Sequence, residues 1–226
     1  MVNIGFLGDI SVGKTSILRN FVRYINEQKI MELNAGKACE VTRNDFSGEA
    51  TINEERKDTG KETKTIHPNR VGFKDLGTGH NHTLFAPGGD RKRPVVRMGI
   101  ITISRIAKEI VTVFSLDQPF KEQFEFFNSI RYLPKKIYVC FNKMDLSMIN
   151  EAETNQKFAE LKDTVSEYFD KRNVKILDFF FTCAENKETY KKYNDNAARM
   201  ILSIASENVD GVPEGKKGKN KAKIPA

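Results

Sequence analysis

The sequence has few cysteines and no long apolar run. Its three cysteines, Cys39, Cys140 and Cys183, do not have the spacing of metal ligands, and so few of them argue against a disulfide framework. Cys140 and Cys183 lie within apolar runs, so we expect buried free thiols. No apolar run approaches the ~20 residues that a membrane helix needs, and a signal peptide is not evident. We therefore expect a cytoplasmic protein without a transmembrane segment.

The net charge of +7 is concentrated near the C-terminal end. Residues 207–226 are rich in glycine, lysine and proline, with almost nothing apolar to bury, so they are predicted to be a disordered basic tail. Such a tail makes weak contacts with RNA or an anionic membrane, or only improves solubility. Residues 1–206 are long enough to form one domain with a substantial core.

Apolar side chains along residues 1–206 alternate between the periods of strands and helices. Residues 28–64 are an exception, and we expect a long functional loop there with room for one short helix. The alternation predicts a three-layer α/β/α sandwich with a mostly parallel six-stranded sheet and one antiparallel edge hairpin at 69–86. Strands are predicted over Val2–Leu7, Asn69–Lys74, His82–Ala86, Glu109–Leu116, Lys136–Phe141 and Val174–Thr182, and helices over 14–27, 95–106, Phe120–Tyr132, Glu151–Phe169 and 187–206.

Residues 8–15, GDISVGKT, match the pattern G-x-x-x-x-G-K-T between the first strand and the first helix. Backbone N–H groups in such a loop point at an anion, and the helix that follows adds the positive end of its dipole. The pattern predicts a phosphate-binding loop in which Lys14 reaches the β- and γ-phosphates and the Thr15 hydroxyl ligates Mg²⁺. The predicted nucleotide contacts here are Asp9, Ile10, Ser11, Val12, Gly13, Lys14, Thr15 and Ser16.

Polar residues also follow two later strands, at the edge of a parallel sheet where ligands bind. After the strand at 136–141, Asp145 offers a carboxylate that can accept hydrogen bonds from the N1–H and N2 amine of guanine, a donor pair that adenine lacks. Asn142 is expected to tether neighbouring loops, and Lys143 to lie along the base. After the last strand come Thr182, Cys183 and Ala184, and the Ala184 N–H is placed to donate to the guanine carbonyl oxygen.

Together, the phosphate-loop pattern, Asn142-Lys143-Met144-Asp145 and Thr182-Cys183-Ala184 resemble the Ras-like small GTPase family over residues 1–206. The resemblance implies a G domain that binds GTP and GDP with Mg²⁺ and changes conformation with the nucleotide. It also implies an effector or activating protein that binds the switch regions. Thr65 corresponds to the switch-one threonine that ligates Mg²⁺. Because Thr65 lies 51 positions after Lys14, an insertion at 28–64 is expected to enlarge switch one and to take part in partner binding.

Residues 85–91, FAPGGDR, look like the D-T-P-G-Q-E-R box of the family's second switch. Bacterial gliding-motility-type relatives also lack the aspartate of this box. In this frame Gly88 donates its N–H to the γ-phosphate, and Phe85 stands where a carboxylate would support Mg²⁺. Gly89 takes the position of the glutamine that orients water. The residues expected to act in hydrolysis are Lys14, Thr65 and Gly88.

A second frame places the aspartate of this box at Asp75 and offers His80 as the water-orienting group. In the first frame no side chain orients water, and Ile10 stands where an arginine finger would enter the site. Because GTP hydrolysis depends on a positioned water and on stabilised phosphate charge, we expect slow intrinsic turnover. The alternatives are a nucleotide-binding scaffold that does not cycle and an RNA- or ribosome-associated GTP-binding factor.

Overall fold

The computed structural model describes residues 1–49, 65–147 and 154–207. Its sheet has seven strands in the order β2-β3-β4-β1-β5-β6-β7. The strands are β1 (Val2–Leu7), β2 (Cys39–Asp45), β3 (Asn69–Asp75), β4 (Asn81–Ala86), β5 (Glu109–Ser115), β6 (Lys136–Asn142) and β7 (Lys175–Phe181). The helices are α1 (Lys14–Asn26), α2 (Ile30–Leu33), α3 (Pro94–Ile106), α4 (Phe120–Asn128), α5 (Thr154–Asp170) and α6 (Lys191–Glu207).

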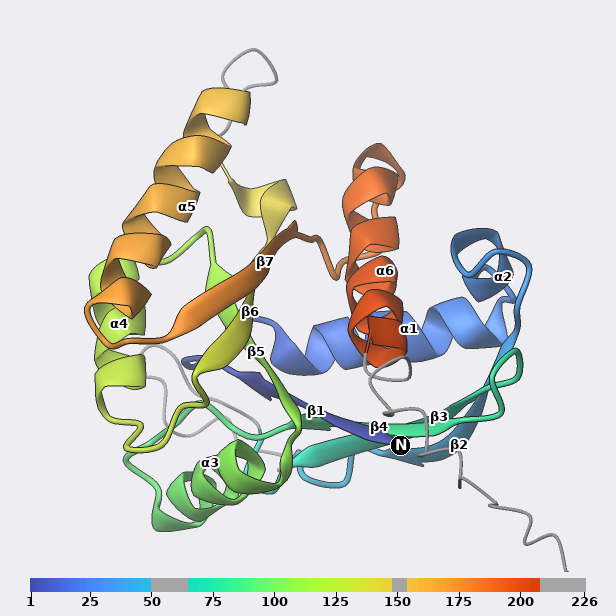
Figure 1. Ribbon diagram of the computed structural model, residues 1–226, viewed down its shortest axis with the longest axis horizontal. Helices are drawn as coiled ribbons and strands as arrows, with labels where there is room; N and C mark the ends of the chain where they lie inside the picture. Colours follow the sequence, from blue (N-terminus) through green and yellow to red (C-terminus); the bar gives the residue numbers. More distant parts are fainter. Residues whose placement is uncertain (50–64, 148–153, 208–226) are drawn as a thin grey trace, which may run out of the picture.

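Helices cover both faces of the sheet, which confirms the predicted three-layer α/β/α architecture (Figure 1). Helices α1, α2 and α6 pack against one face, and α3, α4 and α5 pack against the other. The central strands β5 and β6 are apolar along most of their length because both of their faces are covered. On α1 the side chains at helical spacing that the sequence predicted to be apolar are buried, among them Ile17, Phe21 and Ile25.

The pairing of the strands confirms a mostly parallel sheet with an antiparallel part at one side. Strand β1 pairs in parallel with β4 and β5, and β5, β6 and β7 continue in parallel. Strand β3 is antiparallel to both β2 and β4. The carboxyl ends of five strands therefore lie together with the amino end of β3, along the side of the sheet where the strands end; these five strands are β1, β4, β5, β6 and β7. This side, where the strands end, differs from the edge formed by the outermost strand β2.

The prediction of six strands was wrong because β2 lies within the segment that we expected to be a loop. Cys39 is buried, but most of β2 is exposed, since it forms the edge of the sheet and has a solvent-facing side. A bulge between Val41 and Arg43 interrupts its alternation, which left only a short apolar–polar pattern to detect. The 69–86 hairpin is consequently not at the edge. The short helix allowed for in this segment is α2.

Element boundaries differ from the predictions at a few ends. Helix α4 ends at Asn128 rather than Tyr132, although Ile130 still packs into the core. A 3₁₀ turn at Glu188–Tyr190 precedes α6. The predicted start of α5 at Glu151, residues 50–64 of the insertion and residues 208–226 of the tail lie outside the described residues. All three cysteines are buried free thiols.

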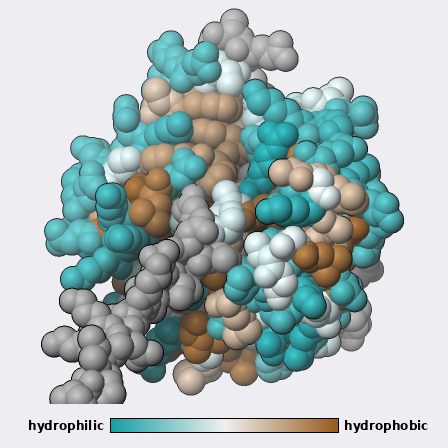
Figure 2. Space-filling model, turned by 45° about the vertical axis from the view of Figure 1, so that its right-hand side comes forward, coloured by the Kyte–Doolittle hydropathy of each residue, from teal (hydrophilic) through white to brown (hydrophobic). Residues whose placement is uncertain are grey.

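Within the described residues, no helix combines the length and the apolar character that a bilayer crossing requires. The face drawn in Figure 2 is mainly hydrophilic, and its apolar residues form several patches with hydrophilic residues between them.

Candidate nucleotide-binding site

The loop at residues 8–13 joins β1 to α1 and has the backbone of an anion-binding site. Ser11 (φ 58°) and Gly13 (φ 91°) both have left-handed conformations, which turn successive N–H groups toward the inside of the loop. A Cβ atom on Gly13 would lie 2.2 Å from Nδ2 of Asn142, so this position requires glycine for space as well as for φ. Gly13 is the N-cap of α1, and no side chain caps the helix. The first N–H groups of α1 are thus left for an external acceptor.

Lys14 is buried at the start of α1, and its side chain turns back over the loop. Its Nζ atom donates hydrogen bonds to the carbonyl oxygens of Gly8 (2.8 Å) and Asp9 (2.7 Å). Burial lowers the pKa of Lys14 to about 7, although the negative charge of Asp9 opposes the shift. A phosphate group in the loop would supply an opposite charge and favour the protonated amine. Lys14 is therefore a buried amine held over the loop, and an anion bound there would keep it protonated.

Asn142, the last residue of β6, connects the phosphate loop to the end of β7. Its Nδ2 donates to the carbonyl oxygen of Val12 (3.0 Å), and its Oδ1 accepts from the Thr182 hydroxyl (3.0 Å). The Met144 N–H also donates to the Thr182 carbonyl oxygen at 3.1 Å. The tether predicted for Asn142 is thus present, and it brings the ends of β1, β6 and β7 together.

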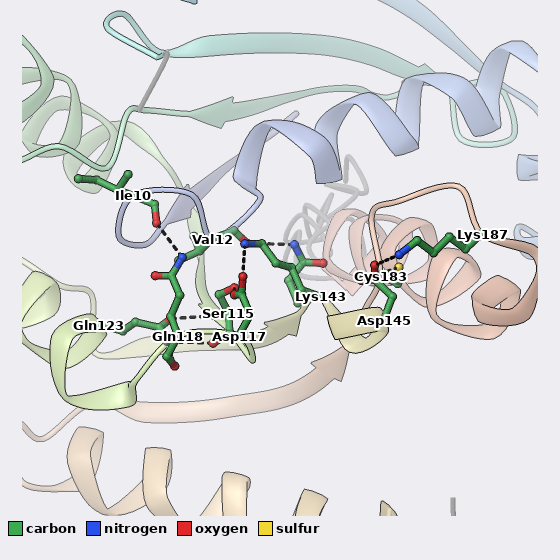
Figure 3. A network of polar contacts seen from close by, with 11 residues as sticks. Ile10, Val12, Ser115, Asp117, Gln118, Gln123, Lys143, Asp145, Cys183 and Lys187 are labelled. Carbon is green, nitrogen blue, oxygen red and sulfur yellow. Dashed lines mark hydrogen bonds and ion pairs between the residues drawn. The ribbon is translucent and has the colours of Figure 1, made fainter. Parts of the chain in front are cut away.

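Asp145 lies in a 3₁₀ turn after β6, next to Cys183 and Lys187 (Figure 3). Its side chain is 1% exposed and contacts Lys187 Nζ at 2.5 Å and Cys183 Sγ at 3.2 Å. Burial alone would raise the pKa of Asp145, but the hydrogen bonds from Lys187 and Cys183 outweigh it and hold the pKa below its ordinary value. Asp145 is therefore an ionised hydrogen-bond acceptor.

Lys143 has a left-handed backbone (φ 65°) and points its amine toward the residues that follow β5. Its Nζ lies 2.9 Å from a carboxylate oxygen of Asp117. Figure 3 shows Lys143 with Asp117 on one side and Asp145 with Lys187 on the other. The ion pairs Lys143–Asp117 and Lys187–Asp145 therefore lie at the same end of the strands as the phosphate loop.

Replacing Lys187 by alanine is expected to raise the affinity for guanine nucleotides, because the lysine occupies the carboxylate that would read the base. Because Lys187 is 46% exposed and solvent screens its charge, we expect a gain of no more than about fivefold. Fluorescence titration with a labelled GDP analogue measures it. Lys191→Ala, which removes an exposed ion pair with Asp195, is the matched control. A loss of affinity would show that Lys187 holds the nucleotide instead.

The structure places the two candidate segments for the second switch at opposite ends of the strands. Strand β3 is antiparallel, so Asp75 and His80 lie at the opposite edge of the sheet from the phosphate loop. The segment after β4 instead reaches the loop: a Cβ atom on Gly89 would lie 2.4 Å from the Asp9 carbonyl oxygen and the Ile10 nitrogen. A Cβ atom on Gly88 would lie 2.2 Å from the Thr65 carbonyl oxygen. Gly88 thus contacts Thr65, and Gly89 is the glycine that lies against the phosphate loop.

The placement expected for Phe85 was wrong. Side chains alternate along β4, and Phe85 packs on the face that α3 covers, with the Arg70 guanidinium 5.5 Å from its ring centroid. Thr15 lies on the other face. There its hydroxyl oxygen accepts a hydrogen bond of 3.0 Å from Nδ2 of Asn69, the first residue of β3. Our sequence analysis did not identify Asn69, because its proximity to Thr15 follows only from the pairing of β3 with β4.

Two further buried amides hold the site loops, and the sequence analysis also missed them. Gln123 on α4 accepts from the Ser115 N–H (2.7 Å) and donates to the Gln118 carbonyl oxygen (3.0 Å). Asn194 on α6 donates to the carbonyl oxygens of Cys183 (2.5 Å) and Glu185 (2.6 Å). Both residues lie on helices and were not distinguishable from ordinary helix residues in one sequence.

Comparisons with known proteins bear on the fold. No protein-family model matches the sequence, and no curated protein does. The chain is similar to the GTPase-like domain of S. cerevisiae Ski7 bound to GTP, with a TM-score of 0.56 and 14% identity over 95% of this chain and 51% of that one. It is also similar to a GTP-binding protein of the archaeon Sulfolobus solfataricus in complex with GDP, with a TM-score of 0.50 and 14% identity over 92% and 53%. The chain spans about half the length of these structures, and the likeness shows that it shares their α/β fold.

Proposed function

We propose that this chain is a G domain that binds GTP and GDP with Mg²⁺ and acts as a conformational switch with slow intrinsic hydrolysis. The observation that carries the proposal is the set of hydrogen bonds through Asn142, which draws the phosphate loop and the Asp145 and Thr182 loops to one edge of the sheet. These loops supply a phosphate cradle at one end and a buried, ionised carboxylate at the other. A guanine nucleoside with a polyphosphate chain matches this combination, because it has an anion at one end and the N1–H and N2 amine donors at the other.

The residues have separate roles in this proposal. Lys14 and the backbone N–H groups of residues 9–16 bind the phosphates, and Asp145 accepts from the N1–H and N2 amine of guanine. Lys143 lies along the base, while Cys183 and Ala184 border it. Mg²⁺ neutralises phosphate charge when it is bound, and the hydroxyl of Thr15 at the start of α1 is chemically suited to ligate it. We assign Thr65 as the second hydroxyl ligand, because it lies beside Gly88 at the end of the same loops.

We expect slow hydrolysis because the residue after Gly88, which lies against the phosphate loop, is a glycine. In the segment after β4, the residue that lies against Asp9 and Ile10 is Gly89, which has no side chain to orient water. The next residue, Asp90, holds Arg93 with a 2.9 Å ion pair and accepts from the Lys92 N–H. A partner protein that completes the site would raise the rate, and the segments around Thr65 and Gly89 are the surfaces through which an effector or activating protein would sense the γ-phosphate.

Single-turnover hydrolysis tests this function. Protein loaded with GTP and Mg²⁺ is expected to form GDP with a rate constant on the order of 10⁻⁴ s⁻¹ or below, the range of a G domain without its activating partner. The product is measured by chromatography over several hours, with Lys14→Ala as the inactive control. Turnover of about 1 s⁻¹ or faster in the isolated protein would contradict a switch that needs a partner. Binding of GTP with no GDP formed after days would favour the non-cycling scaffold.

A further inference from the structure

Asn69 has an unexplained polar atom beside the phosphate loop. Its side chain is 0% exposed, and its Nδ2 donates to the hydroxyl oxygen of Thr15 at 3.0 Å. Its Oδ1 is buried and has no hydrogen-bond partner among the described residues. An amide oxygen buried without a partner costs free energy, and most such oxygens in native proteins do have one. Asn69 therefore has an acceptor oxygen close to Thr15 that no described residue uses.

The chemistry of Thr15 supplies a use for that oxygen. A threonine hydroxyl has one O–H donor and two acceptor lone pairs. In the structure, one lone pair accepts from the Asn69 amide. When the hydroxyl oxygen gives a lone pair to a divalent cation, its O–H becomes a stronger donor and needs an acceptor. A half turn of the Asn69 amide about its Cβ–Cγ bond exchanges nitrogen and oxygen, so that Oδ1 accepts the hydrogen bond from Thr15 and no proton is transferred.

Among the neighbouring described residues, Asn69 is the one placed to accept a hydrogen bond from the Thr15 hydroxyl. In the ladder between β3 and β4 Asn69 pairs with Ala86, which has no polar side chain. Phe85, the residue before it, points to the opposite face of the sheet and contacts Arg70. The carboxylate of the phosphate loop, that of Asp9, already accepts a hydrogen bond from the Ile10 N–H at 2.8 Å. On the face of the sheet that carries Thr15, the polar side chain at the end of the β3–β4 ladder is that of Asn69.

We propose that Asn69 is the positioning residue of the Mg²⁺ site, which accepts the hydroxyl hydrogen of Thr15 while the Thr15 oxygen ligates the metal. The inference rests on the proposed function, because the metal enters with the nucleotide phosphates. In this proposal, the group that orients the metal ligand Thr15 comes from β3 and not from the end of β4. Residues that orient metal ligands in this way typically change metal affinity by about 10–100-fold when they are replaced.

The Mg²⁺ dependence of GDP release tests the role of Asn69. Dissociation of a fluorescent GDP analogue is measured from the full chain in EDTA and at increasing Mg²⁺ concentration. Asn69→Leu, which keeps the size of the side chain but has no acceptor, is expected to raise the Mg²⁺ concentration for half-maximal slowing by about 10–100-fold. The rate in EDTA is the reference for each variant, so that the shift in the Mg²⁺ response is separated from any change in the phosphate or base contacts.

Two other variants complete the design. Asn69→Asp supplies only acceptor oxygens, so it is expected to keep or lower the half-maximal Mg²⁺ concentration, and it tests the proposal even if Asn69→Leu does not fold. Asn20→Ala removes another buried asparagine, on α1, that bonds to the Asn194 carbonyl oxygen; it is expected to lower stability without changing the Mg²⁺ response. An unchanged response in Asn69→Leu, or a weakened one in Asn69→Asp, would overturn the inference alone. A wild type that does not bind guanine nucleotides would contradict the proposed function instead.

Discussion

Replacing Lys14 by alanine is expected to weaken GTP binding at least about 100-fold, because the loop loses its buried cation. Hydrogen bonds to charged groups contribute roughly 1.5–3 kcal/mol each, and an ammonium group between two phosphates makes more than one of them. The loss therefore reaches about 3 kcal/mol or more, which corresponds to this factor. In the structure Lys14 donates to the carbonyl oxygens of Gly8 and Asp9. Calorimetric titration measures the change in affinity.

The control for this variant is Lys121→Ala on α4, which removes an exposed lysine outside the loop. It is expected to bind GTP like the wild type. Circular dichroism and melting temperature establish that both variants are folded, since Lys14 also holds the loop through its two hydrogen bonds. If Lys14→Ala is folded and binds GTP with an unchanged affinity, residues 8–15 are not a phosphate site.

Replacing Asp145 by asparagine is expected to exchange the preferred base from guanine to xanthine. The carboxylate accepts two hydrogen bonds from guanine, whereas an asparagine amide has one acceptor and two donors. Its NH₂ group therefore faces the guanine amine and leaves a buried donor unpaired, which costs about 1–3 kcal/mol. Xanthine has a carbonyl oxygen in place of that amine and pairs with the new donor. We expect GTP affinity to fall about 100-fold and xanthosine triphosphate to become the tighter ligand.

Competition of GTP and xanthosine triphosphate for a fluorescent GDP analogue measures this exchange. Asp178→Asn, at an exposed position of β7, is the control with the same chemical change and no expected effect. Asp145→Asn also weakens the contacts with Lys187 and Cys183, so its melting temperature is compared with that of the wild type. An equal loss of affinity for both nucleotides would show that Asp145 supports the loop without reading the base.

The sequence was sufficient for those parts of the site that depend on local patterns. The phosphate loop directly follows β1, Asn142 ends β6 and Asp145 lies three residues further on. The direction of a parallel sheet places such residues at one end of the strands. Most strands and helices were predictable for the same reason, because both layers of helices impose strong apolar periodicity on the central strands.

What the sequence left undetermined depends on pairing between distant segments. Strand β2 was missed because an exposed, bulged edge strand has little apolar alternation. The frame of the second switch depended on the antiparallel direction of β3, which moves Asp75 away from the phosphate loop. Asn69 follows Pro68 and looked like an ordinary strand start, and only the ladder between β3 and β4 shows that it faces Thr15.

The central claim is that the ends of β1, β6 and β7 together bind a guanosine polyphosphate. Calorimetric titration of the full chain with GTP and with ATP, each with Mg²⁺ at the same concentration, tests it most directly. The account predicts that GTP binds with one-to-one stoichiometry and at least about 100-fold more tightly than ATP, because adenine lacks the N1–H and N2 amine from which the Asp145 carboxylate accepts hydrogen bonds. Equal affinity for the two nucleotides, or binding of neither, would contradict it.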